Sequence, residues 1–179
     1  MKVLVVVDLQ NDFVDGALGT IEAQAIVPNV RKKIEEYKKI IDSQIIFTYD
    51  THYENYLFTN EGKHLPVKHC IYCTHGWEIK DELDVFACED FEETVYLHKT
   101  TFGHLDWKFP IWKDKVIERI ELVGLCTDIC VVSNALILKA TYPEIDIVVD
   151  ASCCAGTTPE NHKAALQTMK MCQINVIGE

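Results

Sequence analysis

The segment GLCTDIC, residues 124–130, carries two cysteines directly after the apolar run 120–123. Gly124 permits a tight exit from a strand, and Thr127 or Asp128 would make a good N-cap, which places Cys130 in the first turn of a helix. The helix dipole and the N–H groups of that turn favour the thiolate, the nucleophilic form of cysteine. The same N–H groups, with that of Cys126, could stabilise an oxyanion. Because a buried cysteine is often only a small hydrophobic residue, this interpretation depends on the neighbours of Cys130.

Two charged residues that follow apolar runs could supply those neighbours. Asp8 comes directly after the run 3–7, and Lys99 follows the run 94–97 with His98 between them. A cysteine hydrolase needs a proton acceptor and a cation close to its thiolate. Asp8 could take the thiol proton and return it to a leaving amine, while Lys99 could lower the pKa of the thiol and keep Asp8 ionised. Taken singly, Asp8 could be a turn residue and Lys99 a solvated surface lysine.

The segment from residue 50 to residue 77 lacks the apolar periodicity of its neighbours and holds four of the seven histidines. A loop of that length in a compact domain usually has a function. Asp50 and His52 would share an exposed strand end, and His69 follows 17 residues later. A carboxylate and two imidazoles suit Zn²⁺, Fe²⁺ or Mn²⁺ and leave positions open for water or substrate. Further potential ligands lie between or near these residues: Glu54, Glu61, His64 and His75.

A second cysteine pattern competes with this site. Cys70 and Cys73 form one CxxC beside His69, which could bind a structural zinc ion or act as a redox pair. A closed zinc site usually contains two such pairs, so the Asp/His site is the stronger interpretation. A metal or thiol sensor without turnover, using Cys70 and Cys73 or Cys153 and Cys154, is the alternative from another functional class.

Six short β-branched runs alternate with helical patterns, which predicts βαβ units and a parallel sheet. We expect one α/β domain over residues 1–179, a three-layer Rossmann-like fold with a six-stranded, mostly parallel sheet and helices on both faces. The expected strands are residues 2–7, 45–49, 94–97, 120–123, 145–149 and 173–177. The expected helices are residues 27–41, 128–141 and 159–171, with a further short helix over 83–87 or 111–116. Ligands of such sheets bind beyond the carboxyl ends of the strands, where the candidate residues fall: Asp8, Asp50, Lys99, Cys130 and Asp150.

Composition narrows the class of partner. Asp and Glu number 28 against 17 Lys and Arg, a net charge of −11 that repels nucleic acid and anionic membranes. A small, neutral or weakly charged molecule is the expected partner. Eight cysteines in 179 residues fall below the density of a disulfide scaffold, and we find neither a signal peptide nor a run of 18 apolar residues. We therefore expect a cytoplasmic protein with mostly free thiols.

The chain resembles the isochorismatase-like cysteine hydrolases, and within them the nicotinamidase/pyrazinamidase branch, over nearly its whole length. The most specific match is GLCTDICV at residues 124–131, and VVVDLQNDF at residues 5–13 is nearly as specific. Further matches are TYDTH at 48–52, PVKHC at 66–70 and HKTTF at 98–102.

This resemblance implies an Asp–Lys–Cys triad, which matches Asp8, Lys99 and Cys130. It also implies a cis peptide bond before Cys126, the residue that opens an oxyanion hole shared with Cys130. Cys130 would attack a small heteroaromatic carboxamide such as nicotinamide, release ammonia and form a thioester that water hydrolyses to nicotinate.

The same branch implies a divalent transition metal (Zn, Fe or Mn) beside the triad, where it can bind the pyridine nitrogen and ordered waters. Asp50, His52 and His69 match three of its ligands. Glu61 matches the fourth best, with His64 and Glu54 as alternatives. Phe13 matches an aromatic wall of the substrate pocket, and Phe102 the aromatic residue after the triad lysine.

Two departures from the family pattern concern the pocket walls. Leu65 replaces a usual aromatic residue before Pro66, and Thr100 follows the triad lysine where serine is usual. Amide hydrolysis is therefore a firmer expectation than nicotinamide as the substrate, and a ureido or carbamoyl substrate is an alternative.

A degenerate scaffold of the same fold is disfavoured because the triad and metal residues are retained. The resemblance also implies a homo-oligomer.

Overall fold

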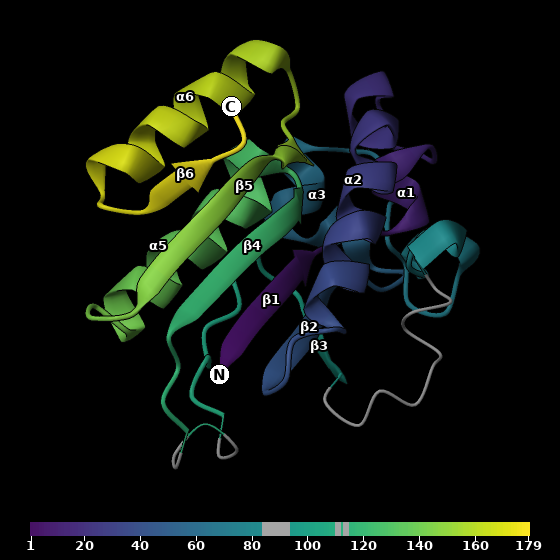
Figure 1. The fold of residues 1–179 in the computed structure, drawn as a ribbon. Helices are drawn as coiled ribbons and strands as arrows, with labels where there is room; N and C mark the ends of the chain where they lie inside the picture. Colours follow the sequence, from purple (N-terminus) through teal and green to yellow (C-terminus); the bar gives the residue numbers. More distant parts are fainter. Residues whose placement is uncertain (84–93, 110–111, 113–114) are drawn as a thin grey trace.

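The computed structural model describes residues 1–83, 94–109, 112 and 115–179. Its centre is a six-stranded sheet in the order β3-β2-β1-β4-β5-β6, in which every neighbouring pair is parallel (Figure 1). The strands are β1 (Lys2–Val7), β2 (Ser43–Asp50), β3 (Thr94–Lys99), β4 (Arg119–Leu125), β5 (Asp146–Ala155) and β6 (Asn175–Ile177). The expected α/β class and six-stranded sheet are confirmed, and the described sheet is parallel throughout.

β1 lies between β2 and β4, and its residues 3–7 are buried. An almost wholly apolar strand fits that place because a parallel sheet is covered on both faces. Leu4 and Val6 face the side covered by α2 (Ile21–Tyr37). Val3, Val5 and Val7 face α5 (Val132–Thr141) and α6 (Pro159–Met171) on the other side (Figure 1). The three layers predicted from the sequence are therefore present.

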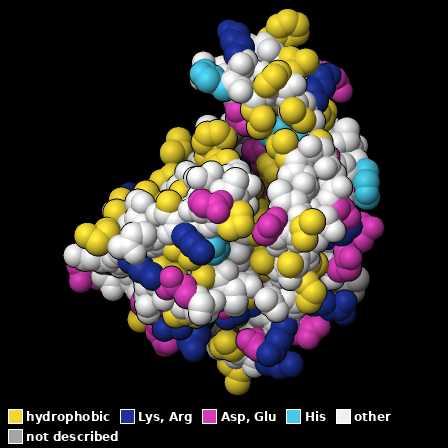
Figure 2. All heavy atoms as spheres, turned by 90° about the horizontal axis from the view of Figure 1, so that it is seen from above, with side chains coloured by type: hydrophobic (Ala, Val, Ile, Leu, Met, Phe, Trp, Pro, Cys, Tyr) yellow, Lys and Arg dark blue, Asp and Glu magenta, His cyan; other side chains and the backbone are white. Residues whose placement is uncertain are grey.

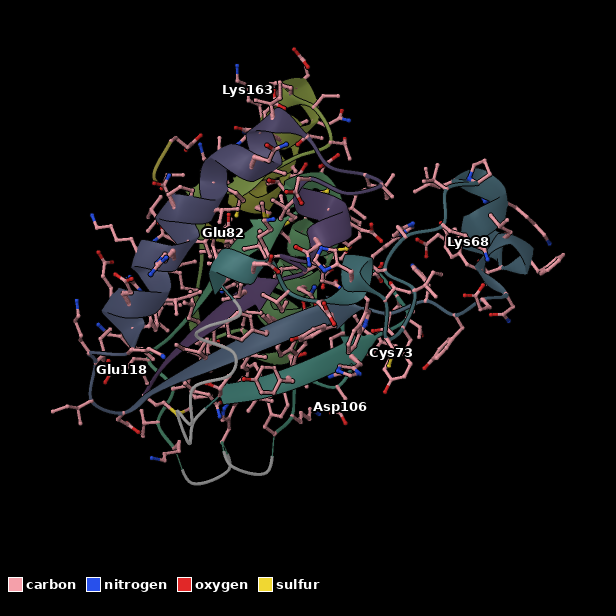
Figure 3. All side chains as sticks on the ribbon, turned by 90° about the vertical axis from the view of Figure 1, so that its right-hand side faces the viewer. Lys68, Cys73, Glu82, Asp106, Glu118 and Lys163 are labelled. Atoms are coloured by element: carbon pink, nitrogen blue, oxygen red, sulfur yellow. The ribbon has the colours of Figure 1, made fainter. Side chains whose placement is uncertain are left out.

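Short elements gather at the carboxyl edge of the sheet. They are α1 (Asn11–Val14), α3 (Asn60–His64) and two 3₁₀ turns at Tyr56–Phe58 and His75–Trp77. Residues 53–68, which we name the arm, project from the body as a separate lobe; Lys68 lies on it (Figures 2 and 3). Hydrophobic side chains lie open on this lobe, and Phe58 is 82% exposed. The segment without apolar periodicity therefore forms an ordered projection over the sheet edge.

α2 differs from the expected helix over 27–41 at both ends. It begins at Ile21, where the Thr20 side chain accepts a hydrogen bond from the N–H of Ala23 at 3.0 Å, and it ends at Tyr37. A start at residue 27 would have put Pro28 in the first turn, where proline is common. Pro28 instead lies inside the helix and removes one backbone hydrogen bond. Burial of the apolar face of α2 against the sheet offsets that loss.

β5 is longer than the expected strand at 145–149 and reaches Ala155. Its pairing with β4 shifts register between Leu122 and Gly124, which lets the strand continue past the irregularity. Asp150 therefore lies inside β5 and does not end it, which corrects its expected place at the carboxyl edge. Cys153 and Cys154 are buried parts of the same strand, not residues of a loop after it.

Three further expectations concern the remaining segments. The candidate short helices at 83–87 and 111–116 fall largely outside the described residues. The seven cysteines in the described part of the chain are all free thiols, as expected. None of the described helices has the length and apolar character needed to cross a membrane.

Candidate active site

The carboxyl ends of four neighbouring strands bring the predicted reactive residues together. Asp8 follows β1, Asp50 ends β2, Lys99 ends β3, and Cys130 lies in the turn after β4. All four side chains are buried, with at most 5% of each residue exposed. The strand order β3-β2-β1-β4 makes these ends adjacent, which is why residues far apart in the sequence meet here.

Lys99 is the centre of this group. Its Nζ lies 2.6 Å from Asp8 Oδ2 and 3.7 Å from Asp50 Oδ1, and it donates to Cys130 Sγ at 3.6 Å. Burial alone would lower the pKa of Lys99, but the charges of Asp8, Cys130 and Asp50 raise it above its ordinary value. Lys99 is therefore a permanent cation between the thiol and two carboxylates.

Asp8 is held by the neighbouring strand β2. The Thr48 hydroxyl donates to Asp8 Oδ1 at 2.6 Å, and the backbone N–H of Asp8 bonds to Thr48 O at 3.2 Å. Asp8 has a φ of +46°, a region that aspartate enters more readily than most residues. Its second oxygen is thereby directed at Lys99. We did not expect Thr48 from the sequence, although it precedes Asp50 by two positions and so shares its face of β2.

The electrostatics differ from the expected thiolate. Burial raises the pKa of Cys130 well above its ordinary value, and the charge of Asp8 adds to that effect, while Lys99 opposes it. Burial and the charge of Asp50 also raise the pKa of Asp8, against the lowering effect of Lys99. The thiol of Cys130 and the carboxyl group of Asp8 are therefore both weaker acids in this site than in water.

The nucleophile turn, residues Thr127–Val131, is a π-helical turn that leads into α5. Cys130 lies in this first turn, as predicted, and the Leu125–Cys126 peptide bond is cis, as the resemblance implied. The N-cap position is Cys126, without a side-chain capping bond, so the expected capping by Thr127 or Asp128 is wrong. The side chains of Thr127 and Asp128 bond instead to His162 and Thr157.

Asp50, His52 and His69 form a buried group, which we name the metal group, whose potential ligand atoms all lie within 4.8 Å of one another. His52 Nε2 is buried without a well-aligned hydrogen-bond partner among the described residues, although Asp50 Oδ2 lies 3.0 Å away. The Nδ1–H of His69 donates to Val67 O at 2.8 Å, which leaves Nε2 directed at the group. A nitrogen aimed at carboxylates without a matching hydrogen bond suits a metal ion, so the residues fit the metal that the resemblance implied.

Glu61 supplies the nearest additional carboxylate. Its Oε1 lies 3.5 Å from His52 Nε2 and 3.8 Å from His69 Nε2. Glu54 is directed into an exposed pair with Lys68 at 2.7 Å, and His64 bonds to Asn60 O at 2.8 Å. The arm therefore brings Glu61 to the metal group and directs the two alternative ligands elsewhere.

The same atoms of the metal group that would bind a metal ion also bind protons, so the pKa values of these side chains matter. Burial opposes protonation of His52, but the carboxylates of Asp50 and Glu61 outweigh burial and raise its pKa to about 9. Burial would raise the pKa of Asp50, but His52, His69 and Lys99 lower it below its ordinary value. Tyr56 packs against both histidines at ring-centroid distances of 4.6 and 5.0 Å, a brace that sequence reasoning missed.

The CxxC interpretation finds no support in the geometry. Cys70 is buried and Cys73 exposed, and neither belongs to the potential metal group found among the described residues. The N–H of Cys70 donates to Asp12 Oδ2 at 2.8 Å, and the backbone of Cys70 also bonds to His52 N–H at 2.9 Å. Cys70 therefore ties the loop after His69 to the sheet through its backbone.

A cavity of about 1140 Å³ opens above the thiol and extends beneath the arm. Figure 2 looks onto this edge, and the surface is hollowed between the arm and the body. Phe13 and Phe102, the two expected pocket residues, both line it, as do Leu65 and Thr100. The described lining contains no lysine or arginine. The cavity therefore connects the thiol to the metal group.

Known proteins resemble the chain over almost its full length. The isochorismatase-domain family profile matches residues 2–178. A nicotinamidase from Schizosaccharomyces pombe is 25% identical, covering 98% of this chain and 92% of the relative. The structure of a nicotinamidase/pyrazinamidase from Bacillus subtilis superposes with a TM-score of 0.85 at 26% identity, covering 98% of each chain. A pyrazinamidase from Pyrococcus horikoshii in complex with zinc superposes with a TM-score of 0.79 at 26% identity, covering 99% of each chain.

Proposed function

The chain belongs to the isochorismatase family, and from that premise we propose that it is a cysteine amidohydrolase that converts nicotinamide to nicotinate and ammonia. Support for the proposal comes from one arrangement above all. Lys99 contacts both Asp8 and Cys130 beneath a cavity that Cys130 lines together with the metal group. A nucleophile, a base and a site for a heteroaromatic nitrogen then lie in one cavity.

Cys130 and Asp8 act as one proton-transfer unit in this proposal. As Cys130 Sγ forms a bond to the carboxamide carbon, the thiol proton passes to Asp8 and the carbonyl electrons move to the oxygen. The N–H groups of Cys126 and Cys130 would hold that oxyanion. Collapse breaks the C–N bond, and the proton on Asp8 goes to the leaving nitrogen, which departs as ammonia. The raised pKa of Asp8 suits this sequence because a more basic carboxylate takes the thiol proton more readily.

The resulting thioester is hydrolysed by a reversal of roles. Asp8 accepts a proton from the attacking water, the C–S bond breaks, and Cys130 recovers its proton. Lys99 stays protonated throughout and offsets the negative charge that moves between Cys130 and Asp8.

Asp50, His52, His69 and Glu61 would hold the metal ion, which we propose to be Zn²⁺, Fe²⁺ or Mn²⁺. When bound there, such an ion supplies Lewis acidity toward a ring nitrogen or a water molecule. The side chains themselves position the ring, because Phe13 stands with its ring centroid 5.4 Å from that of His69 at the same wall.

The residues that line the cavity indicate the charge that the substrate carries. Ureido and carbamoyl acids carry a carboxylate that needs a cationic partner, and no lysine or arginine lines the described cavity. An uncharged heteroaromatic amide is therefore the substrate class we propose.

The homo-oligomer implied by the resemblance belongs to the same proposal, and light scattering of the purified protein tests it.

Ammonia release from a panel of amides tests the function. Wild type and Cys130→Ala would be compared on nicotinamide, pyrazinamide, benzamide and a carbamoyl amino acid, with Cys172→Ala as a matched control at an exposed thiol. We expect turnover of the first two compounds that is abolished in Cys130→Ala and retained in Cys172→Ala. A preference for the carbamoyl acid, or equal inactivity of wild type and Cys130→Ala on every compound, would refute the proposal.

A further inference from the structure

We propose that α6 and the connection before it position the nucleophile turn, with Asp128 and His162 as positioning residues; this inference rests on the proposed function. We name the bonded set of Thr127, Asp128, Thr157 and His162 the clamp. Two of its members come from the nucleophile turn and two from the β5–α6 connection and α6. None of the four belongs to the triad or to the metal group.

The first bond of the clamp is made by Asp128. Its Oδ1 accepts from the backbone N–H of Thr157 at 2.8 Å, and its Oδ2 accepts from the Thr157 hydroxyl at 2.5 Å. The Thr157 hydroxyl in turn accepts from Asn161 Nδ2 at 2.9 Å, so it cannot easily turn away from Asp128. One carboxylate thus fixes the turn to the start of α6 through both of its oxygens.

The second bond of the clamp joins Thr127 to His162 in the interior of the protein. Thr127 is fully buried, and its hydroxyl lies 2.8 Å from Nδ1 of His162 on the first turns of α6. Burial lowers the pKa of His162, so the ring is neutral near pH 7 and can accept from the hydroxyl. The two consecutive residues of the nucleophile turn therefore bind the same neighbouring helix region through two separate side chains.

The fit between the two segments leaves no spare room. A methyl group at Gly156 would lie 2.9 Å from Asp128 Oδ1 and 2.9 Å from the Cβ of His162. Glycine at this position therefore allows the close approach that both bonds need. Gly156 and Thr157 also line the cavity beside Cys126 and Ile129, so the clamp stands next to the reaction without touching the reacting atoms of Cys130.

The clamp affects the position of the N–H groups that would stabilise the oxyanion. The nucleophile turn has no side-chain cap of its own, and its N–H groups at Ile129 and Val131 are bonded to Cys126 O at 3.0 and 3.1 Å. The proposed oxyanion donors, the N–H groups of Cys126 and Cys130, flank Thr127 and Asp128. A shift of about 1 Å in such donors can lower a rate by about a hundredfold. The clamp therefore acts on the transition state more than on binding of the substrate.

The test measures kcat and KM of Asp128→Ala and Asp128→Asn with nicotinamide, together with the alkylation rate of Cys130 by iodoacetamide. Lys163→Ala is the matched control, because Lys163 lies on the same turn of α6 and points to solvent (Figure 3). Asp128→Ala should lower kcat by about 10- to 100-fold and change KM less than about threefold. Alkylation needs no oxyanion hole, so its rate should change less than about threefold. Asp128→Asn should recover part of kcat, because its Oδ1 can still accept from Thr157.

Three results would overturn the clamp. The first is an Asp128→Ala kcat within twofold of wild type, and the second is a loss of kcat that alkylation shows equally. If wild type cleaves no amide, the proposed function fails, and backbone hydrogen exchange then decides about the clamp. Faster exchange at residues 126–131 in Asp128→Ala supports the clamp in that case, and unchanged exchange is the third overturning result.

Discussion

Two lysines in the described part of the chain, the buried Lys99 and the half-buried Lys33, each bridge two carboxylates, yet their surroundings differ. Lys99 lies 2.6 Å from Asp8 and 3.7 Å from Asp50, at the carboxyl edge of the sheet. Lys33 of α2 lies 2.8 Å from Glu121 and 2.8 Å from Asp150, over the middle of β4 and β5. In both groups burial would lower the pKa of the lysine, and the carboxylates raise it. Charge and distance alone therefore do not distinguish them.

The two groups differ in the other residues that contact them and in whether a cavity lies next to them. The remaining acceptors of the Lys33 group are taken by structural donors, since Tyr37 donates to Glu121 at 2.9 Å and Ser152 to Asp150 at 2.6 Å. The Lys99 group instead contains a thiol, and that thiol lines a cavity. A buried ion pair is weak evidence of function by itself. An ion pair that shares its charge with a nucleophile at a cavity floor is much stronger evidence.

Replacement of Lys99 should reduce catalysis strongly, whereas replacement of Lys33 should not. Lys99→Met should lower kcat/KM for nicotinamide by about 10³- to 10⁴-fold, because the charge moving between Cys130 and Asp8 loses its cation. Lys33→Met should leave kcat/KM within about twofold of wild type, measured in the same ammonia-release assay. Similar losses in both variants would show that the two groups do not differ as we describe.

Replacement of Lys33 should be visible in stability instead. Lys33→Met leaves Glu121 and Asp150 buried without their cation, which should lower the free energy of unfolding by about 3 kcal/mol, more than a hundredfold in the equilibrium constant. Lys32→Met is the matched control, because its side chain is 77% exposed and its pair with Glu36 spans 3.9 Å; it should change stability by less than about 0.5 kcal/mol. Urea titration followed by circular dichroism measures both, and equal stability of the two variants would contradict the role of Lys33.

The arm offers a similar contrast between two glutamates. Glu61→Gln should weaken metal binding by at least about a hundredfold, since loss of even an outer partner of a metal ligand costs about 10- to 100-fold. Glu54→Gln should have no such effect, because Glu54 pairs with Lys68 on the surface. Competition with a chelator measures both affinities. Should Glu54→Gln be the weaker binder, the fourth ligand has been assigned to the wrong residue.

The affinity of the site for a metal ion should also depend on pH. His52 must be neutral to bind a metal ion, and its pKa is raised to about 9 by Asp50 and Glu61. Affinity should therefore increase by about tenfold per pH unit from pH 7 to pH 9, as the competing proton is lost, and then level off. Chelator competition at pH 7, 8 and 9 measures this slope. A flat profile over that range would show that His52 is already neutral at pH 7.

The parts of this site that could be predicted from the sequence are those tied to strand ends. The apolar run before Asp8 predicts a central buried strand, and such strands deliver their next residue to the carboxyl edge. Lys99 and Cys130 follow from the same rule. The resemblance favours Glu61 over Glu54 and His64 as the fourth ligand, and the arm places Glu61 nearest to the histidines.

Other features depend on tertiary contacts that leave no local pattern. The extension of β5 past Asp150 arises from a register shift against β4, which periodicity within β5 does not show. The raised pKa of Cys130 follows from its burial among neighbours, which outweighs the expected effect of the helix start. The bond between Thr127 and His162 joins positions 35 residues apart, and neither residue carries a signal for the other.

The most direct test of the account is to quench wild-type turnover of nicotinamide with acid and map the modified residue by mass spectrometry. We predict a nicotinoyl adduct on the peptide that contains Cys130, absent in Cys130→Ala, with Cys126 and the other thiols unmodified. Turnover of nicotinamide by Cys130→Ala at the wild-type rate, or an acyl group found on another residue, would contradict the central claim that Cys130 is the nucleophile.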